Sequence, residues 1–417
     1  MKLACLQQNL CSAIRVLESF LATRNTAPIM NSILLETSQS HLRLVVTNLE
    51  MTISYVIFAR IEQEGSIAVP LSVFSELVGS LPPNEKIEMQ LVEKALQIRC
   101  ARFEAHIGGI DSKMFPPVSK FQDGVTITAE VGKIRQAINY LVFATASSDS
   151  RPVLRSINAK IDGNSLTLAA SDGFRLAVYK MNLLTPTNRK FEIIIPSSTL
   201  KELNRLLSGQ IEVKVNHPFK IDIKRTSVSE EIVINHSNYD MRVINSPLDA
   251  NTIIEININQ AQNLIIFKLD KVDLTSRLTI GNYPQYEKLI PQMSSAKAII
   301  NVRKFLEAAK IVTFLSLEQE DAFIRLIISP MGESTLGKIT IYARSDNITY
   351  KIGEVDAIVE GGESKIAVKP KFLIEMLTVI EEESISLETT NPTEPCVIKP
   401  MGLDNYAHVI MPLNVQW

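Results

Sequence analysis

One order of predicted elements occurs three times along the chain, and this repeat constrains the fold more than any other feature. Each copy contains a strand, an amphipathic helix, a hairpin of alternating apolar residues around a short polar turn, and a strand that leads into a second helix. The turn residue recurs at intervals of 124 and 174 positions, at Asn48, Asp172 and Asp346. The start of the second helix recurs at intervals of 126 and 173 positions, at Pro70, Pro196 and Lys369. Because two independent landmarks agree, a whole domain is repeated, and a solenoid with units of about 20–50 residues is excluded.

Each copy is predicted to be an α+β domain, with an antiparallel sheet and two helices on one side of it. The domain boundaries are expected at 1–123, 124–294 and 295–417. The second interval is longer because the second copy contains an insertion, which we place near 225–275. Within it Thr252–Asn259 and Asn263–Lys268 alternate like strands, so we expect the insertion to enlarge a sheet or to form an outer hairpin. Three such domains in series can form a curved arc.

The composition is that of a folded, soluble protein. Hydrophobic residues make up 46% and charged residues 21%, and the formal net charge is −2. This charge argues against a protein that coats nucleic acid or a membrane surface, although it allows a basic surface on one face. No run approaches the roughly 18 apolar residues of a membrane span, and the four cysteines are scattered without a CxxC pair. We therefore expect a cytoplasmic protein that does not bind a membrane.

Motifs for catalysis or metal binding are not recognisable in the sequence. The stretch Gly332–Ile339 resembles a phosphate-binding loop, but it ends in Ile339 where such a loop needs Ser or Thr, and it continues into strand-like alternation. The five histidines stand alone, without a second ligand at metal-binding spacing, so packing or surface positions are expected for them. We predict a protein that is not an enzyme and needs no cofactor or metal.

Five short stretches follow one another along the chain in a recognisable order: Thr47–Met51, Ser148–Leu154, Ser171–Leu176, Tyr283–Pro291 and Val409–Leu413. In this order, and on a threefold repeat, they resemble the bacterial DNA sliding clamps, the β subunit family of DNA polymerase III. The resemblance covers essentially the whole chain. It implies a non-catalytic processivity factor, in which each three-domain arc joins a second copy head to tail. The homodimer would close a ring around double-stranded DNA, with helices lining the hole.

A ring that slides must hold phosphates without reading bases, so its inner helices should carry Lys and Arg. A basic residue on a helix is often only solvated, but recurrence in all three copies favours a role in DNA binding for the set Arg15, Lys133, Arg135, Lys201, Arg205, Lys304, Lys310 and Lys371. The resemblance further implies that DNA is touched by Arg24, Ser148, Arg151, Pro152 and Val153.

The resemblance also implies a groove between the second and third domains that binds short peptides of partner proteins. Those partners are the catalytic subunit of DNA polymerase III, the clamp loader, repair polymerases and other proteins with a clamp-binding motif. Apolar side chains there would take a hydrophobic anchor, and plain core packing is the alternative interpretation of each of them. The matching residues are Leu154, Ser171, Gly173, Phe174, Arg175, Leu176, Pro284, Lys288, Leu289, Pro395, Val409, Ile410, Met411, Pro412 and Leu413.

Phe174 stands where some relatives carry His, which makes this surface more apolar, and Asn414–Trp417 extends the tail. The other two copies share the turn but lack the Gly-Phe-Arg-Leu sequence that follows Asp172. This difference predicts a task peculiar to the second copy. Two alternatives stay open: a diverged paralogue that binds partner peptides without encircling DNA, and an enzyme on a duplicated scaffold. The sequence assigns no role to the insertion and does not identify the residues that close the ring.

Overall fold

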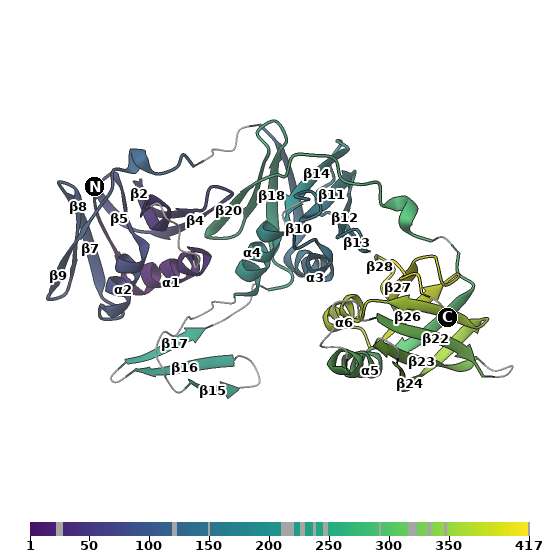
Figure 1. Cartoon of the computed structure of the whole chain (residues 1–417). Helices are drawn as coiled ribbons and strands as arrows, with labels where there is room; N and C mark the ends of the chain where they lie inside the picture. The colour runs from purple at the N-terminus through teal and green to yellow at the C-terminus, as the bar shows by residue number, and fades with distance from the viewer. Residues whose placement is uncertain are drawn as a thin grey trace. The chain divides into compact units, whose positions relative to one another are not determined.

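The three predicted repeats are present in the computed structural model (Figure 1), which describes residues 1–21, 28–118, 123–148, 151–209, 221–225, 230–236, 239–244, 249–291, 293–315, 323–331, 335–345 and 348–415. Two compact units are formed. One contains Met1–Gly132 and Thr199–Leu278, and the other contains Lys133–Ser198 and Thr279–Trp417. The division passes through the second repeat, so each unit holds one complete outer repeat and part of the middle one.

The first repeat consists of nine strands and two α-helices: β1 (Lys2–Leu6), α1 (Gln7–Glu18), β2 (Ser32–Ser38), β3 (His41–Thr47), β4 (Met51–Phe58), β5 (Arg60–Gln63), β6 (Ser66–Pro70), α2 (Leu71–Ser80), β7 (Lys86–Val92), β8 (Ala95–Cys100) and β9 (Phe103–Gly108).

Among the described residues the second repeat follows the same order without a counterpart of β5, and it adds three strands after its second helix: β10 (Val125–Glu130), α3 (Val131–Leu141), β11 (Ser156–Asp162), β12 (Ser165–Ser171), β13 (Arg175–Asn182), β14 (Phe191–Pro196), α4 (Ser197–Ser208), β15 (Ile221–Arg225), β16 (Glu230–His236), β17 (Tyr239–Ile244), β18 (Ile253–Asn259), β19 (Leu264–Lys268) and β20 (Val272–Arg277).

The third repeat follows the order of the first, except that one long strand, β24, takes the places of β4 and β5: β21 (Ala296–Asn301), α5 (Val302–Leu315), β22 (Phe323–Pro330), β23 (Leu336–Ser345), β24 (Ile348–Gly361), β25 (Ser364–Val368), α6 (Pro370–Val379), β26 (Ser384–Thr389), β27 (Cys396–Pro400) and β28 (Tyr406–Ile410). The strand expected after the segment that resembled a phosphate-binding loop is confirmed, because Ile339 lies within β23; residues 332–334 of that segment lie outside the described residues.

The insertion lies earlier in the chain than the sequence indicated. The two strand-like segments expected inside it are β18 and β19, yet β18 pairs with β10 as β7 pairs with β1 and β26 with β21. These segments therefore belong to the repeat. The extra strands are β15, β16 and β17, which pair only with one another, within the described residues, in a three-stranded sheet. Alternation marks any half-buried strand, so it could not separate inserted strands from repeated ones.

Two of the sheets continue from one repeat into the next. An eight-stranded sheet has the order β10-β18-β19-β20-β4-β3-β2-β6, and a twelve-stranded sheet has the order β14-β11-β12-β13-β28-β27-β26-β21-β24-β23-β22-β25. The first joins repeats one and two through β20 and β4, and the second joins repeats two and three through β13 and β28. The last strand of one repeat thus pairs with the β4-type strand of the repeat before it. We call these pairings the first and second junctions.

Helix α1 packs against α2 in the first repeat and α5 against α6 in the third, on one face of the sheets (Figure 1), as expected for an α+β domain. In the third repeat Phe305 of α5 and Met376 of α6 are fully buried against alternating residues of β22 and β23, such as Leu326 and Ile341. This alternation makes one face of each strand apolar, which is the reason the helices cover that face. None of the helices among the described residues is long and apolar enough to span a membrane.

Candidate functional site

The turn between β12 and β13 is held by the side chains of its own first residues. Asp172 Oδ1 accepts hydrogen bonds from the backbone N–H groups of Phe174 and Arg175, at 2.9 and 3.0 Å. Ser171 Oγ donates to the carbonyl of Arg175 and accepts from the N–H of Gly173. Gly173 has a φ of +92°, a left-handed conformation that glycine adopts without strain. The Asp-Gly pair predicted from the sequence therefore sets the backbone of this turn.

The first repeat has the same turn with different residues. Asn48 Oδ1 accepts from the N–H groups of Glu50 and Met51, and Thr47 Oγ1 donates to the carbonyl of Met51. Leu49 occupies the left-handed position with a φ of +74°. The residue that follows each paired segment is bound to the turn in the same way. Arg277 N–H donates to the carbonyl of Glu50, and Met411 N–H donates to the carbonyl of Phe174. The two junctions are therefore copies of one backbone arrangement.

The side chains that face each other across the two junctions differ in polarity. At the second junction Leu176 lies opposite Val409, and Val178 lies opposite Ala407. At the first junction the corresponding pairs are Thr52 with Thr275 and Ser54 with Asp273. Only the second junction therefore presents an apolar strand pair on this face of the sheet.

The connector between repeats two and three covers part of this apolar face. Tyr283 and Tyr286 are buried against Leu176, Val178 and Val409, with Ala169, Ile194 and Val397 completing the cluster. Burial raises the pKa of both tyrosines, so their hydroxyls stay protonated. These residues form a buried apolar cluster beside the turn.

The predicted groove residues divide into a buried set and an accessible set. Leu154, Arg175, Leu176, Val409 and Ile410 are at most 7% exposed, so core packing accounts for their burial. Ile410 belongs to the core of the third repeat, away from the connector tyrosines. Exposed or half-buried are Ser171, Gly173, Phe174, Pro284, Lys288, Leu289, Pro395, Met411, Pro412 and Leu413.

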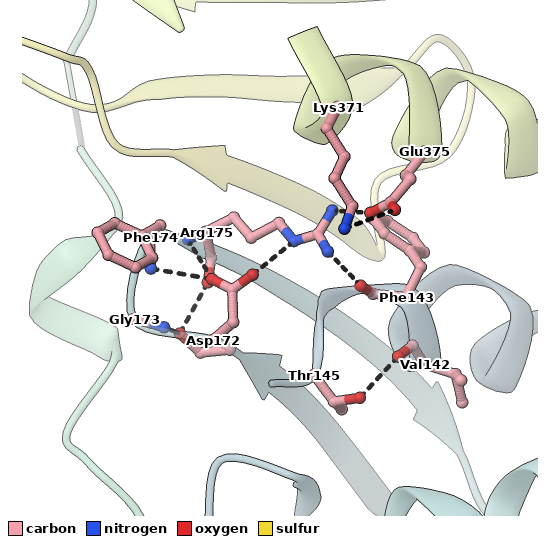
Figure 2. Close-up of polar contacts among 10 residues, drawn as sticks. Val142, Phe143, Thr145, Asp172, Gly173, Phe174, Arg175, Lys371 and Glu375 are labelled. Atoms are coloured by element: carbon pink, nitrogen blue, oxygen red, sulfur yellow. Dashed lines mark hydrogen bonds and ion pairs between the residues drawn. The ribbon is translucent and has the colours of Figure 1, made fainter. Parts of the chain in front are cut away.

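Arg175 is a buried cation whose side chain leaves the turn and reaches α6 (Figure 2). Its Nε donates to Asp172 Oδ2 at 3.0 Å, its Nη1 to Glu375 Oε2 at 2.6 Å, and its Nη2 to the carbonyl of Phe143. The guanidinium also lies over the rings of Phe143 and Phe372, with 5.3 and 4.6 Å between Cζ and the ring centroids. Arg175 therefore ties the turn to helix α6 of the third repeat.

Phe174 is exposed on 58% of its surface, although it follows directly on a rigid turn. Its ring stacks on that of Phe372, with centroids 6.4 Å apart and an angle of 22° between the planes. The ammonium group of Lys369 lies 5.8 Å from the centroid of the Phe174 ring. An aromatic side chain and a cation thus stand together on the accessible side of the turn.

The predicted DNA-binding residues have different surroundings. Arg205 is largely buried: its Nε donates to Glu202 and its Nη2 to the carbonyl of Val16, which joins α4 to α1. Lys371 is exposed and lies 3.8 Å from Glu375. Arg24 lies outside the described residues. Exposed are Lys133, Ser148, Arg151, Pro152, Lys201, Lys304 and Lys310, and half-buried are Arg15, Arg135 and Val153.

Several residues of this site escaped the sequence-based prediction. Phe143 lies in the short 3-10 helix Val142–Ala144 that follows α3. Lys369 lies directly before α6, and Phe372 and Glu375 lie within it. No local sequence pattern links these residues to Arg175. The sequence did contain one sign that Arg175 does not line the groove. Successive residues of a strand point to opposite faces of the sheet, so Arg175 and Leu176 cannot both face the groove.

The described residues contain no cluster of acidic, histidine or cysteine side chains that could hold a metal ion. His408 is fully buried beside the Phe143 ring, and burial lowers its pKa to about 3, so it packs as a neutral side chain.

The sequence and the fold are similar to those of known proteins along the whole chain. Three models of the DNA polymerase III beta subunit match in order: the N-terminal domain over residues 1–119, the central domain over 128–285 and the C-terminal domain over 287–414. The beta sliding clamp of Bacillus subtilis is 26% identical, and the alignment covers 99% of this chain and 100% of that protein.

Solved structures of sliding clamps have a similar fold. The DNA polymerase sliding clamp of Bacillus subtilis superimposes with a TM-score of 0.80 at 25% identity. The DNA polymerase III subunit beta of Pseudomonas aeruginosa superimposes with a TM-score of 0.83 at 21% identity. Both alignments cover 100% of each chain.

Proposed function

The chain belongs to the DNA polymerase III beta subunit family and is a non-catalytic DNA sliding clamp, and from this premise we propose that two copies join head to tail around duplex DNA. The observation that supports ring closure is the repeated strand junction. The last strand of repeat two pairs with β4, and the last strand of repeat three pairs with β13. Two copies of this chain can continue the pattern.

The strands needed for a third junction are both present at sheet edges. β9 is the last strand of repeat one, and among the described strands it pairs only with β8. β24 is the β4-type strand of repeat three; its C-terminal part pairs with β21, whereas from Ile348 to Asp356 it has only β23 beside it within the described residues. An open edge offers unpaired N–H and C=O groups to a second chain. We infer that β9 of one copy pairs with β24 of the other.

The closed dimer would hold DNA by topology and by phosphate contacts that do not depend on sequence. The accessible candidates for these contacts are Lys133, Lys201 and Lys304 on three helices and Arg151 with Pro152 in the loop before β11. Arg205 is a weaker candidate, because its guanidinium is already bonded to Glu202 and Val16. Arg24, Arg135, Ser148 and Val153 keep the roles that family membership suggests.

Partner proteins would dock at the second junction. The accessible residues Phe174, Pro284, Leu289, Met411 and Leu413 lie in the turn, in the connector and after β28, and we call these five residues the docking surface. The apolar pair Leu176 and Val409 is buried against the connector tyrosines. Such a surface suits an extended peptide with an apolar anchor. The partners proposed are the polymerase catalytic subunit, the clamp loader and repair polymerases. The proposed place of these interactions is the cytoplasm.

The ring is tested by loading the protein onto circular DNA with its loader and then cutting the circle. A topologically linked ring is retained on the circle and leaves the linear product by sliding from its ends. Retention that is the same on circular and linear DNA would contradict the proposal. A linear DNA with both ends blocked by bound protein serves as control, because a sliding ring stays on it.

A further inference from the structure

Resting on the docking function proposed above, one feature of the docking surface defines which partner segments it selects. Phe174 projects an exposed ring at the tip of a turn whose backbone makes four hydrogen bonds with the side chains of Ser171 and Asp172. A rigid, exposed aromatic side chain loses little conformational entropy when a partner packs on it. The position of this ring is therefore suited to binding, and its exposure has no explanation within the chain.

The ring of Phe174 is held in place by the third repeat. Phe372 stacks against it, and Phe372 is itself covered by the guanidinium of Arg175. Figure 2 shows Arg175 bonded to Asp172, Glu375 and the Phe143 carbonyl. Because Arg175 also covers Phe372, the two stacked rings belong to the same connected set of contacts. A partner's aromatic side chain can add a further stacked or edge-to-face ring to this pair.

The charge beside this ring is positive and uncompensated. Within the described part of the chain no carboxylate lies in ion-pair distance of Lys369, whose ammonium group instead lies over the Phe174 ring. The nearby carboxylate of Glu375 is bonded to Arg175 and also faces Lys371. The cation of Lys369 is therefore available to a negative group that approaches along the ring.

We propose that Phe174, Phe372 and Lys369 form a specificity site that selects partner segments in which an aromatic residue neighbours Asp or Glu. The partner's ring packs on Phe174, and its carboxylate pairs with Lys369. Charge complementarity beside the docking surface carries this assignment.

The test uses the full chain and synthetic peptides with one apolar anchor and one aromatic residue, in which Asp or Lys replaces Ala at each flanking position in turn. We expect one position at which the Asp peptide binds about two- to fivefold more tightly than the Lys peptide, as is usual for an exposed ion pair. Lys369→Glu should reverse this preference at the same position. Phe174→Ala should remove the advantage of an aromatic residue over Ala.

Lys365→Glu is the matched control, since it makes the same charge change four residues earlier, in β25. It should leave the preference unchanged, because salt screens charges beyond about 8 Å at physiological ionic strength. A preference that is identical in the wild type and in Lys369→Glu would overturn the proposal while neutral peptides still bind. If no peptide binds, neutral ones included, the docking function itself is wrong and this inference falls with it.

Discussion

At the scale of single residues, Arg175 shows how one side chain can serve a site without lining it. Family resemblance places it among the groove residues, but its side chain is 5% exposed and its guanidinium is bonded on the helix side of the sheet. Breaking a buried ion pair by removing one partner costs about 3–5 kcal/mol. Since Glu375 keeps about a third of its side-chain exposure, we take the lower end of this range.

We therefore predict that Arg175→Met destabilises the unit that contains it by about 3 kcal/mol, measured by chemical denaturation. It should also weaken binding of partner peptides, because the turn loses its tie to α6. Lys371→Met is the control, since Lys371 is exposed and its ion pair with Glu375 is long. Equal stability of the two variants would show that the buried contacts of Arg175 contribute nothing.

His408 gives a prediction for the pH dependence of stability. Its pKa is about 3 in the folded chain and near 6.5 when unfolded, so between these values the unfolded chain binds a proton that the folded chain excludes. Stability should therefore fall as the pH is lowered from about 6.5 towards 3, by up to about 1.4 kcal/mol per pH unit from this group. His408→Leu should have a shallower slope in denaturation experiments between pH 7 and 5. Parallel slopes would contradict the assignment.

The sequence predicted the residues of the turn but not their supports. Asp172 and Gly173 act through bonds within five residues, so their local pattern contains the information. Arg175 acts through Glu375 and Phe143, which are distant in sequence and meet it only after two repeats have paired. A single sequence gives no sign of such contacts.

At the scale of elements, the two junctions can be compared directly, because they share a backbone arrangement and differ in their side chains. Their turns and strand registers are the same, yet Leu176 and Val409 at the second junction correspond to Thr52 and Thr275 at the first. Duplication explains the shared backbone, and the apolar pair explains why docking is proposed at the second junction alone. The sequence predicted the copies correctly but could not show which strands face each other.

The double variant Leu176→Thr and Val409→Thr gives the second junction the side chains of the first. We predict a loss of peptide affinity of about tenfold, because the connector tyrosines Tyr283 and Tyr286 pack on this pair and would lose their apolar support, and a change of about 1.4 kcal/mol is a factor of ten. Peptide titration measures the loss, and circular dichroism checks that the sheet persists. Thr52→Val at the first junction is the control and should leave affinity unchanged. Undiminished affinity in the double variant would place the docking surface elsewhere.

At the scale of the whole molecule, the repeat predicts the register of the contact that closes the ring. The strand pairs observed in each repeat can be followed from its first strand to its last strand, so that equivalent residues of the last strands are identified. Phe103 of β9 is then equivalent to Val272 of β20 and to Tyr406 of β28. Those residues lie opposite Tyr55 and Tyr179.

In repeat three the register is followed from the strand before the second helix, where Ile324 lies opposite Val368 as Ile33 lies opposite Val69. Two residues further along, Leu326 lies opposite Ile341 as Leu35 lies opposite Leu44. Ile341 in turn lies opposite Gly353 as Leu44 lies opposite Tyr55, so Gly353 holds the place of Tyr55.

We predict that Phe103 of one copy lies opposite Gly353 of the other. Directly opposed residues of antiparallel strands have Cβ atoms about 4.5–5.5 Å apart, which is near the range that a disulfide bridges. The double variant Phe103→Cys and Gly353→Cys should therefore form a covalent dimer on mild oxidation, visible by non-reducing electrophoresis. Loaded on circular DNA before oxidation, it should stay on the circle in high salt and leave after linearisation.

Phe103→Cys with Asp356→Cys is the matched control, because Asp356 lies on the same strand about 10 Å further along at about 3.3 Å per residue. It should cross-link poorly. Cross-linking that is equally efficient in both variants would indicate random collision, and cross-linking of the control alone would indicate a different register. Either result would separate the closing contact from the two junctions inside the chain, and the ring would then need a contact that the repeat does not provide.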